Sequence, residues 1–330
     1  MSGVSKRNKA SSESGPGWFR RCATFVGTLL WHACAWISAP LLIAGLVVRF
    51  TIRDEADSIA VLFYATPWAV LWAMSVICLI YWWKLPRVRW VTLILTAGCL
   101  TMWVVRGFGF APTPRGSVET SFRITYWNVA RPEWRLNSIL AQAGRMTSDF
   151  YVFGEPRNGN SISPKWKEYF GGRTVLPLTR ELLLVSPEAV TPIDGGSLGG
   201  SGECQMCRTV VHGREVFLLT VDFDPTPYKS RRPAFDRLFQ IVDAYSEKPL
   251  LVIGDFNTPA DSSHFDRLRT RLTNAFETAG RGYGSTWPMP VPVMQLDHIW
   301  TNKHLRAVQC DHVTSLYSDH RAVVADVVFP

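Results

Sequence analysis

The chain has 330 residues, of which 47% are apolar and 14 are tryptophan, so it can form a large core with material to spare. Its net charge of +8 lies in the first third. Residues 1–110 hold 11 Lys/Arg against 4 Asp/Glu, whereas residues 111–330 hold 24 against 23. The second part is nearly neutral, which argues against binding of polyanions through a broad basic surface. We therefore expect recognition at a defined site.

The N-terminal third is predicted to be membrane-embedded. A polar tail at residues 1–21 is expected to be disordered, and residues 22–110 are expected to form three transmembrane helices. The first two uncharged runs exceed the roughly 20 residues that span a bilayer. The third run has 16 residues and is flanked by tryptophan and arginine, which suit the membrane interface; a re-entrant or interfacial helix is the alternative. The three runs are residues 22–48, 59–83 and 90–105.

Lysine and arginine are distributed asymmetrically around these runs. The tail carries five of them, and the second loop carries Lys84, Arg87 and Arg89. Loops rich in these residues stay in the cytoplasm. Three spans then place everything after residue 105 on the other side, so we expect a multi-pass protein with an extracytoplasmic C-terminal domain.

Residues 111–120 are predicted to be a linker, and residues 121–330 to be one α/β domain. Many short strands with a few amphipathic helices favour two packed sheets with helices outside. The helices are expected at residues 133–145, 233–246 and 263–279, and a flexible loop at residues 194–202. Strands are expected at residues 122–128, 150–153, 175–178, 182–186, 207–211, 216–223, within 250–257, 295–301, 307–313 and 322–329.

Cys204 and Cys207 form a C-x-x-C pair without a second pair elsewhere in this domain. A redox or zinc half-site is one interpretation of such spacing. The two residues enter an expected strand, so packing or an adventitious disulfide is the preferred interpretation.

The apolar run LLVIGDFN at residues 250–257 is the most informative stretch. It is typical of a strand buried on both faces, and Gly254 lets the backbone approach another group closely. Asp255 and Asn257 are two residues apart, so their side chains can point the same way. An acid and an amide in a buried place are costly unless a metal or substrate meets them. An ordinary turn is the alternative.

Further polar residues lie where other expected strands end or bend. Each has an ordinary explanation alone, such as a turn cap or a solvent-facing acid. Their joint occurrence beside GDFN predicts one site at the rim of the sheets. They are Asn128 in FRITYWN, Glu155 in DFYVFGE, Asp297 in QLDHIW, and Asp319 with His320 before AVVADVVF.

Metal-assisted hydrolysis of a phosphoester needs such a set. Mg²⁺ prefers oxygen ligands and is held by one or two carboxylates while keeping several waters. Glu155 is the best single ligand, with Asp319 in support. Asp255 can orient and deprotonate the attacking water, steadied by Asn257.

His320 supplies the complementary positive charge. Beside a carboxylate it is biased towards imidazolium, which would stabilise charge that develops on the phosphate oxygens. Asp297 is the carboxylate expected to fix its ring.

At these residues the sequence resembles the endonuclease/exonuclease/phosphatase superfamily, which includes DNase I and the neutral sphingomyelinases. The resemblance covers about residues 122–328. It rests on WNV at 127–129, Glu155, GDFN at 254–257, STW at 285–287, LDHI at 296–299 and SDH at 318–320.

The resemblance implies a four-layer α/β sandwich, cleavage of phosphoesters, and dependence on Mg²⁺, with Mn²⁺ as an alternative. It also implies that Asn128 helps to hold the network of the site residues. With three spans in front, the chain is most similar to bacterial membrane-anchored members, which places the catalytic domain in the periplasm.

The sequence departs from the family pattern at Asp222, within TVDFDP, where many members carry a His that assists the leaving group. Ala130 stands where some members carry a second metal-site acid. Our first expectation for Asp222 is a metal or water-network role. A silent acid is the second, and a general acid with a strongly raised pKa is the third.

The expected function is a Mg²⁺-dependent phosphodiesterase acting on nucleic acid or phospholipid headgroups, without an obligate protein partner. Trp287 and Arg232 are weaker site candidates. Lys229, Arg231 and Arg232 are read first as a solvated basic turn and second as a phosphate-gripping rim. The alternative from another class is a catalytically silent, membrane-tethered scaffold of the same fold, which only Asp222 favours.

Overall fold

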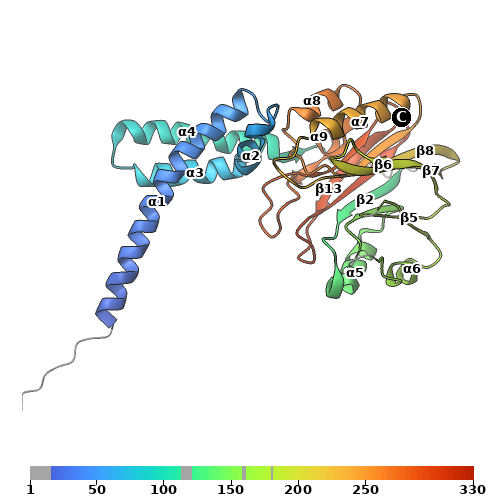
Figure 1. Cartoon of the computed structure of the whole chain (residues 1–330), viewed down its shortest axis with the longest axis horizontal. Helices are drawn as coiled ribbons and strands as arrows, with labels where there is room; N and C mark the ends of the chain where they lie inside the picture. The colour runs from blue at the N-terminus through green and yellow to red at the C-terminus, as the bar shows by residue number, and fades with distance from the viewer. Residues whose placement is uncertain (1–15, 113–120, 158–160, 180) are drawn as a thin grey trace, which may run out of the picture.

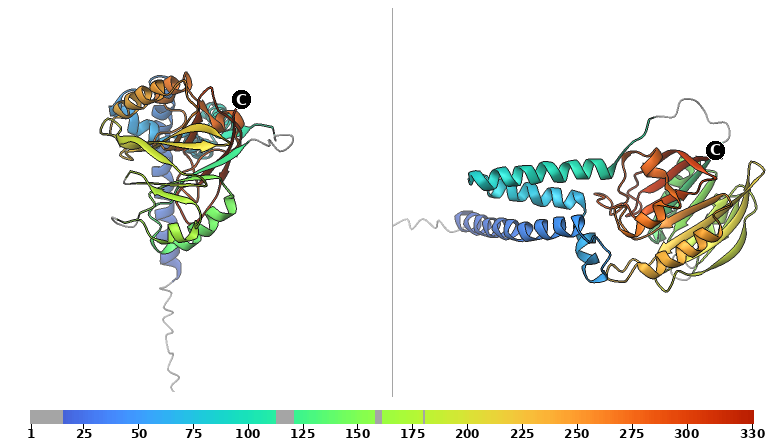
Figure 2. Two further views of the ribbon diagram at one scale, coloured as in Figure 1. Left: turned by 90° about the vertical axis from the view of Figure 1, so that its right-hand side faces the viewer. Right: turned by 90° about the horizontal axis from the view of Figure 1, so that it is seen from above.

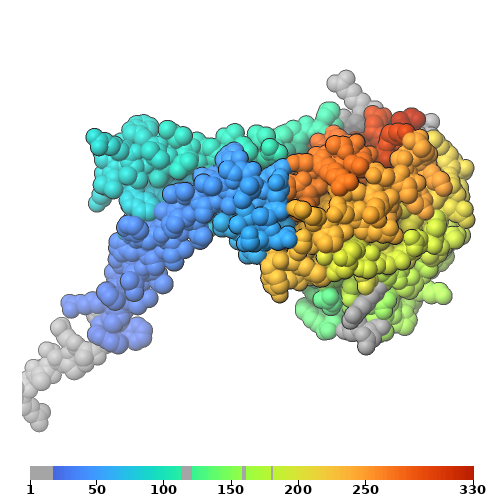
Figure 3. All heavy atoms as spheres, turned by 45° about the horizontal axis from the view of Figure 1, so that its top comes forward, coloured from blue at the N-terminus to red at the C-terminus, as the bar shows by residue number. Residues whose placement is uncertain are grey.

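The structure is a computed structural model that describes residues 16–112, 121–157, 161–179 and 181–330. Residues 1–15 of the expected tail and 113–120 of the expected linker lie outside these residues. Residues 16–21, which were expected to belong to the disordered tail, instead form the start of the first helix. Figure 1 shows a bundle of helices, blue to teal, that extends from one side of an α/β body, green to red. The sphere view shows the two parts in contact (Figure 3).

The helical region contains four helices in the part of the chain that the structure describes: α1 Pro16–Phe50, α2 Asp57–Ala65, α3 Trp68–Tyr81 and α4 Pro86–Gly107. Of these, α1 and α4 are long and apolar enough to cross a membrane. At about 1.5 Å per residue, α4 reaches about 33 Å, further than the 16-residue run predicted.

The second apolar run does not form one straight helix, as its length suggested. It forms α2 and α3, which bend by 65° and together count as either one broken span or a re-entrant loop. Pro67 lies at the break. Proline has no backbone N–H to donate, and its ring clashes with the preceding turn, so a helix cannot continue undisturbed through it.

The three longer helices run back and forth. The loop between α1 and α2 and the C-terminal end of α4 both lie at the α/β body, whereas the α3–α4 turn lies at the far end (Figure 2, right). Large apolar side chains on α1 and α4 are exposed, among them Trp36, Ile43, Ile94 and Val105. Such surfaces suit a lipid environment.

Two six-stranded sheets form the body within the described ranges. One has the order β13-β14-β2-β3-β5-β4 and the other β10-β12-β9-β8-β7-β6. The first contains β2 Phe122–Asn128, β3 Phe150–Gly154, β4 Thr174–Pro177, β5 Leu182–Ser186, β13 Arg306–Val313 and β14 Ala322–Val328. The second contains β6 Thr191–Ser197, β7 Gly202–Val211, β8 Arg214–Phe223, β9 Leu250–Asp255, β10 Thr273–Asn274 and β12 Asp297–Thr301.

The expected four-layer α/β sandwich is confirmed. Apolar side chains of both sheets, such as Ile124 and Ile253, pack between them. The outer face of the first sheet packs on α5 and α6, and that of the second on α7 and α8. The helices of the body are η1 Glu133–Arg135, α5 Leu136–Met146, α6 Lys165–Tyr169, α7 Arg232–Ala244, α8 His264–Arg269 and α9 Ala275–Ala279.

Two local predictions are wrong. Residues 194–202 are not all loop, because β6 pairs along β7 as an edge strand. All β6 side chains are exposed, so its sequence carries no apolar alternation. Residues 263–279 are not one helix, because β10 interrupts them by pairing with β12. Asn274 then caps α9, its side chain accepting hydrogen bonds from two backbone N–H groups.

The cysteine pair serves packing. Cys204 and Cys207 both lie in β7 and are buried and free. They face opposite sides of the sheet, since Cys204 packs with the α7 layer and Cys207 with the core between the sheets. An odd spacing on a strand always separates side chains in this way, so the pair holds no common metal.

Candidate active site

Three acids stand side by side at one edge of the second sheet. β8 and β9 are parallel, which places Asp222 opposite Asp255. β12 is antiparallel to β9 and begins at Asp297, which is also opposite Asp255. Gly254 permits this close pairing, because a Cβ there would lie 1.9 Å from the carbonyl oxygen of Val221.

Asn128, at the end of β2, joins the first sheet to these acids. Its Nδ2 donates to Oδ2 of Asp255 at 3.2 Å and, more weakly, to Oε1 of Glu155 at 3.4 Å. Its Oδ1 accepts from the backbone N–H of Ala130, and its carbonyl oxygen accepts from the hydroxyl of Ser318. Since each polar group of Asn128 has a partner, its orientation between the sheets is fixed.

His320 lies against both buried acids of the second sheet. Its Nδ1 donates to Oδ2 of Asp297 at 2.8 Å, and its Nε2 is 3.9 Å from Oδ2 of Asp255. The three residues offer ligand atoms within 4.8 Å of one another. The ring is held from behind, because Trp127 donates from Nε1 to the carbonyl oxygen of His320.

The charges of this group are interdependent. Burial opposes a charge on His320, but the carboxylates of Asp297, Asp255 and Asp319 prevail and raise its pKa to about 10. Burial, followed by the charge of Asp297, raises the pKa of Asp255 to about 7 although His320 opposes the shift. An imidazolium beside a carboxylate that titrates near neutrality suits a phosphate-binding acid and a general base.

Asp222 is surrounded by other carboxylates. Burial, followed by the charges of Asp255, Glu155, Glu181 and Glu203, raises its pKa well above the ordinary value. Its place in β8 therefore gathers carboxyl groups at one corner of the site, and their proximity disfavours a charge on Asp222.

Backbone conformation marks the same region. Four of the seven non-glycine residues with positive φ in the described segments surround the site: Ala130, Arg131, Glu155 and Asn257, at φ between 45° and 49°. Such conformations cost about 1 kcal/mol or more each and tend to gather at functional sites. They direct Glu155 and Asn257 out of the lines of β3 and β9.

Two arginines have roles that the sequence did not reveal. Arg131 contacts Glu155 at 3.1 Å and Glu181 at 3.7 Å. Arg231 is only 2% exposed and donates to the carbonyl oxygens of Asp224 and, at 3.1 Å, Asn257. The only sequence signals were their nearness to WNV and to the 229–232 basic cluster.

The solvated-turn interpretation of that cluster is therefore wrong for Arg231, which is buried because it crosslinks two loops. Lys229 forms a partly exposed ion pair with Asp224. Arg232 is exposed and donates to the carbonyl oxygen of Glu55 in the helical region at 3.4 Å.

The remaining two predicted residues contact each other beside the buried group. Trp287 donates from Nε1 to Oδ2 of Asp319 at 3.2 Å. Asp319 is exposed and directly precedes His320. It lies outside the three-residue group of Asp255, Asp297 and His320.

Solved structures of low sequence identity share this fold. An endonuclease/exonuclease/phosphatase family protein from Bacteroides thetaiotaomicron is 14% identical, with 64% of this chain and 98% of that chain covered and a TM-score of 0.53. A mannosyl-6-phosphatase from Bacteroides thetaiotaomicron VPI-5482 is 13% identical, with 63% and 100% covered and a TM-score of 0.51. The catalytic domain of human Nocturnin, with bound sulfate, is 17% identical, with 64% and 94% covered and a TM-score of 0.50.

No curated protein matches the chain. The family model described as the Endonuclease/Exonuclease/phosphatase family matches residues 81–320, which is more than half of the sequence. The expected membership of the endonuclease/exonuclease/phosphatase superfamily is thereby confirmed. The chain belongs to the Endonuclease/Exonuclease/phosphatase family and is a phosphoric ester hydrolase.

Proposed function

We propose that this protein is a membrane-anchored, divalent-metal-dependent phosphodiesterase that directs a water molecule onto phosphorus. One observation carries the proposal: a continuous set of contacts joins Glu155, Asn128, Asp255, His320 and Asp297 across the two sheets. It brings a base, a cationic acid and a metal-binding carboxylate to one place, as hydrolysis of a phosphoester requires.

The chemistry of the donors fits a divalent cation. Glu155 is about a quarter exposed and is one of the acids that, together with burial as the larger cause, raise the pKa of Asp222. A hard cation with oxygen ligands would relieve the repulsion among these acids. We assign Glu155 as its main ligand, with Asp319 and Asp222 in support, and Mg²⁺ as the cation, with Mn²⁺ as the alternative. When bound, the cation would neutralise charge on the phosphoryl oxygens.

His320 is not assigned as a ligand, although it belongs to the group of three residues within 4.8 Å. A ligand nitrogen must be unprotonated, whereas Asp297 holds His320 in its charged form. We assign its Nε2–H to a phosphoryl oxygen. Asp297 also has a buried Oδ1 that accepts no hydrogen bond from the described part of the chain, which leaves an acceptor free for a water or a substrate hydroxyl.

Asp255 is assigned as the base. Its Oδ1 accepts from the backbone N–H of Asn257 at 2.7 Å, and its Oδ2 accepts from Asn128. These donors orient the carboxylate while leaving lone pairs for a water proton. The side chain of Asn257 donates from Nδ2 to the carbonyl oxygen of Phe223 at 2.8 Å, so Asn257 acts through the position of its own backbone.

The substrate and the setting are proposed together. α1 and α4 suit a bilayer, and the nearly neutral charge of residues 111–330 disfavours non-specific duplex binding. We propose a phosphodiester at a membrane surface, such as a phospholipid headgroup, with nucleic acid as the competing substrate. The catalytic body would face the periplasm of a bacterial inner membrane.

The test uses the full chain in detergent micelles with bis(p-nitrophenyl) phosphate, phospholipid vesicles, DNA and RNA. We expect hydrolysis with Mg²⁺ that EDTA abolishes, and a large loss in Asp255→Asn. The matched control is Asp243→Asn, at an exposed ion pair with Arg271, which should keep wild-type rates. Hydrolysis that survives both EDTA and Asp255→Asn would refute the proposal.

A further inference from the structure

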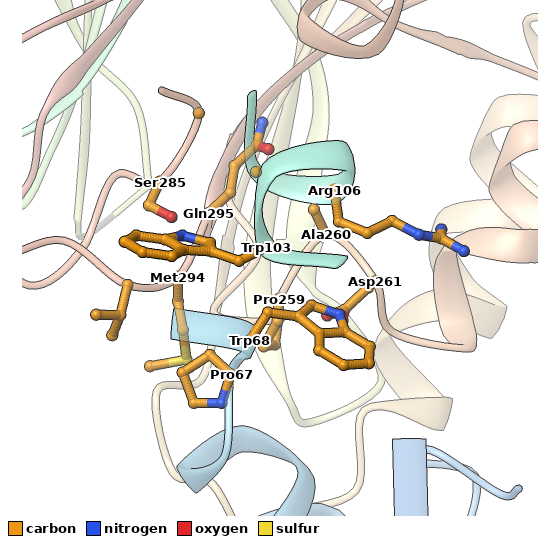
Figure 4. A pocket seen from close by; sticks show the side chains of 13 residues that line it. Pro67, Trp68, Trp103, Arg106, Pro259, Ala260, Asp261, Ser285, Met294 and Gln295 are labelled. Carbon is orange, nitrogen blue, oxygen red and sulfur yellow. The ribbon is translucent and has the colours of Figure 1, made fainter. Parts of the chain in front are cut away.

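The helical region contacts the catalytic body at two places, and each place leads directly to one half of the site. The first is the segment that joins α1 to α2, and the second is the end of α4 with β1 Phe108–Phe110. Figure 4 shows the junction, where Trp68 of α3 lies beside Asp261 and Trp103 of α4 lies beside Met294.

Arg49, the last basic residue of α1, is fully engaged at the first place. Its side chain is 2% exposed and forms an ion pair with Asp261 of the body. It also donates to the carbonyl oxygens of Thr66 at 2.6 Å and Phe63 at 2.9 Å, and it lies over the Phe63 ring. The guanidinium therefore joins the break between α2 and α3 to the body.

Asp54 supplies the complementary contact. It is 1% exposed and accepts from the hydroxyl of Ser262 at 2.5 Å and from the N–H and the hydroxyl of Ser263, both at 2.8 Å. Ser263 stands at the N-cap of α8, yet its hydroxyl does not cap the helix. It binds the helical region instead.

Arg49 and Asp54 both bind the segment of residues 257–263. Asn257, at its start, is fixed through its carbonyl oxygen by Arg231. The guanidinium of Arg231 also interacts with the hydroxyl of Tyr64 in α2. That hydroxyl donates to Asp54 at 3.2 Å. Both ends of the segment are thus connected to one cluster of residues between α1 and α3.

The second place leads to His320. β1 pairs with β11 Arg281–Tyr283, and Trp103 donates from Nε1 to the hydroxyl of Tyr283 at 3.3 Å. The carbonyl oxygen of Tyr283 accepts from Arg321 at 2.7 Å. Arg321 follows His320 in the chain, so the end of α4 is two contacts away from the residue next to His320.

A plain membrane tether needs none of these contacts, since a flexible segment would suffice. A buried Arg and a buried Asp are unfavourable unless nearly every polar atom is paired, and such pairs specify one relative position. Between the two attachments a hollow of about 590 Å³ remains, lined by residues of α4, β1, α8 and α9. The helical region and the body are therefore connected mainly at these two attachments.

We propose that the helical region is part of the catalytic apparatus, and that Arg49 and Asp54 are positioning residues that hold the 257–263 segment and, with it, Asn257 and Asp255. The proposal rests on the proposed function of the site. It means that a change in the packing of α1 against α3 alters the geometry of the site without any contact with the substrate.

The experiment measures kcat and KM of the full chain in micelles with Mg²⁺ and bis(p-nitrophenyl) phosphate. Arg49→Met and Asp54→Ala are expected to lower kcat by about 10- to 100-fold, as small displacements of catalytic groups do, with KM within about twofold. Arg49→Lys, which keeps the charge but not the multi-donor geometry, should recover part of the loss. Ser263→Ala, which removes one hydroxyl, should lower kcat by about two- to fivefold and guards against variants that fail to fold.

A second readout does not depend on activity. Hydrogen exchange at the amides of Ser263 and its neighbours should accelerate in Asp54→Ala, because Asp54 accepts from that N–H, while exchange in β9 and β12 stays slow. Arg271→Met, which breaks an exposed pair with Asp243, is the matched control and should change neither readout. If the wild type hydrolyses nothing, the proposed function fails. The exchange result still shows whether Asp54 holds the 257–263 segment.

The proposal is overturned if kcat of Arg49→Met and Asp54→Ala stays within twofold of the wild type. It is also overturned if exchange at residues 257–263 is unchanged, or if exchange accelerates equally throughout the body. The last result would show that these contacts support stability in general.

Discussion

The imidazole of His320 donates from Nδ1 to Oδ2 of Asp297 at 2.8 Å, and both side chains are buried. Asp297 begins β12 of one sheet, and His320 precedes β14 of the other. The ion pair therefore joins the two sheets at the site. Because the pair lies away from water, removing one partner leaves a costly buried charge.

The pH dependence should follow from this pair and from Asp255. Activity is expected to rise as Asp255 ionises near pH 7 and to fall as His320 loses its proton near pH 10. In Asp297→Asn the alkaline limb should move towards the ordinary histidine pKa of 6.5. The check is kcat/KM against pH for both proteins; an alkaline limb that does not move in the variant would contradict the role of Asp297.

The same pair predicts a stability effect. The folded pKa of His320 lies above 6.5, so its stabilisation is complete below pH 6.5 and is lost as the pH rises through about 10. Unfolding by denaturant at pH 6 and pH 10 should show a larger decrease in stability for the wild type than for His320→Gln. Equal decreases would show that the ion pair does not account for the change.

Glu155→Gln tests the metal site. The variant keeps the size of the side chain and removes its charge, so we expect weaker Mg²⁺ binding and a loss of activity on the order of 100-fold or more, with an intact fold. Calorimetric titration measures Mg²⁺ binding, and circular dichroism measures whether the fold is intact. Glu168→Gln, in α6, is the control, and unchanged Mg²⁺ affinity in Glu155→Gln would reject the assignment.

The variant Asp222→Asn distinguishes the three roles left open by the sequence. If Asp222 is a silent acid, the substitution should leave both Mg²⁺ affinity and activity nearly unchanged. If it supports the cation, Asp222→Asn should weaken Mg²⁺ affinity and slow good and poor leaving groups alike. If it is a general acid, the loss should be largest for poor leaving groups. We expect the first result, because the raised pKa of Asp222 comes from burial and neighbouring acids, and a bound cation would lower it. A steeper leaving-group dependence in Asp222→Asn would reverse this ranking.

Reporter fusions test the orientation. The end of α4 lies at the body and the α3–α4 turn at the opposite end of the helices (Figure 2). Alkaline phosphatase, which is active only outside the cytoplasm, should be inactive when fused after Leu85 and active when fused after Pro112. The reverse pattern would invert the orientation, and equal activity at both positions would show that α4 does not span.

The sequence alone identified most of the fold because its signals are local. Uncharged runs marked α1 and α4, and buried apolar runs marked strands such as β9. It failed where a local pattern had to compete with pairing between distant segments. β6 has no apolar face and exists because β7 pairs with it, and β10 interrupts an apparently helical stretch because β12 pairs with it.

The motifs around Asn128, Glu155, Asp255, Asp297 and His320 pointed to the residues of the proposed site, since each follows or precedes an apolar run. Sequence periodicity shows which face of a strand is buried, but not which strand lies beside it.

Only the tertiary structure decided how the site is assembled. It brought Asn128 to Asp255 across 127 positions, and Arg49 to Asp261 across 212. Arg49 and Asp54 looked like ordinary charges beside a membrane span. Their role became visible only where the chain folded back on them, because the partners of a buried charge are set by packing between segments that share no local pattern.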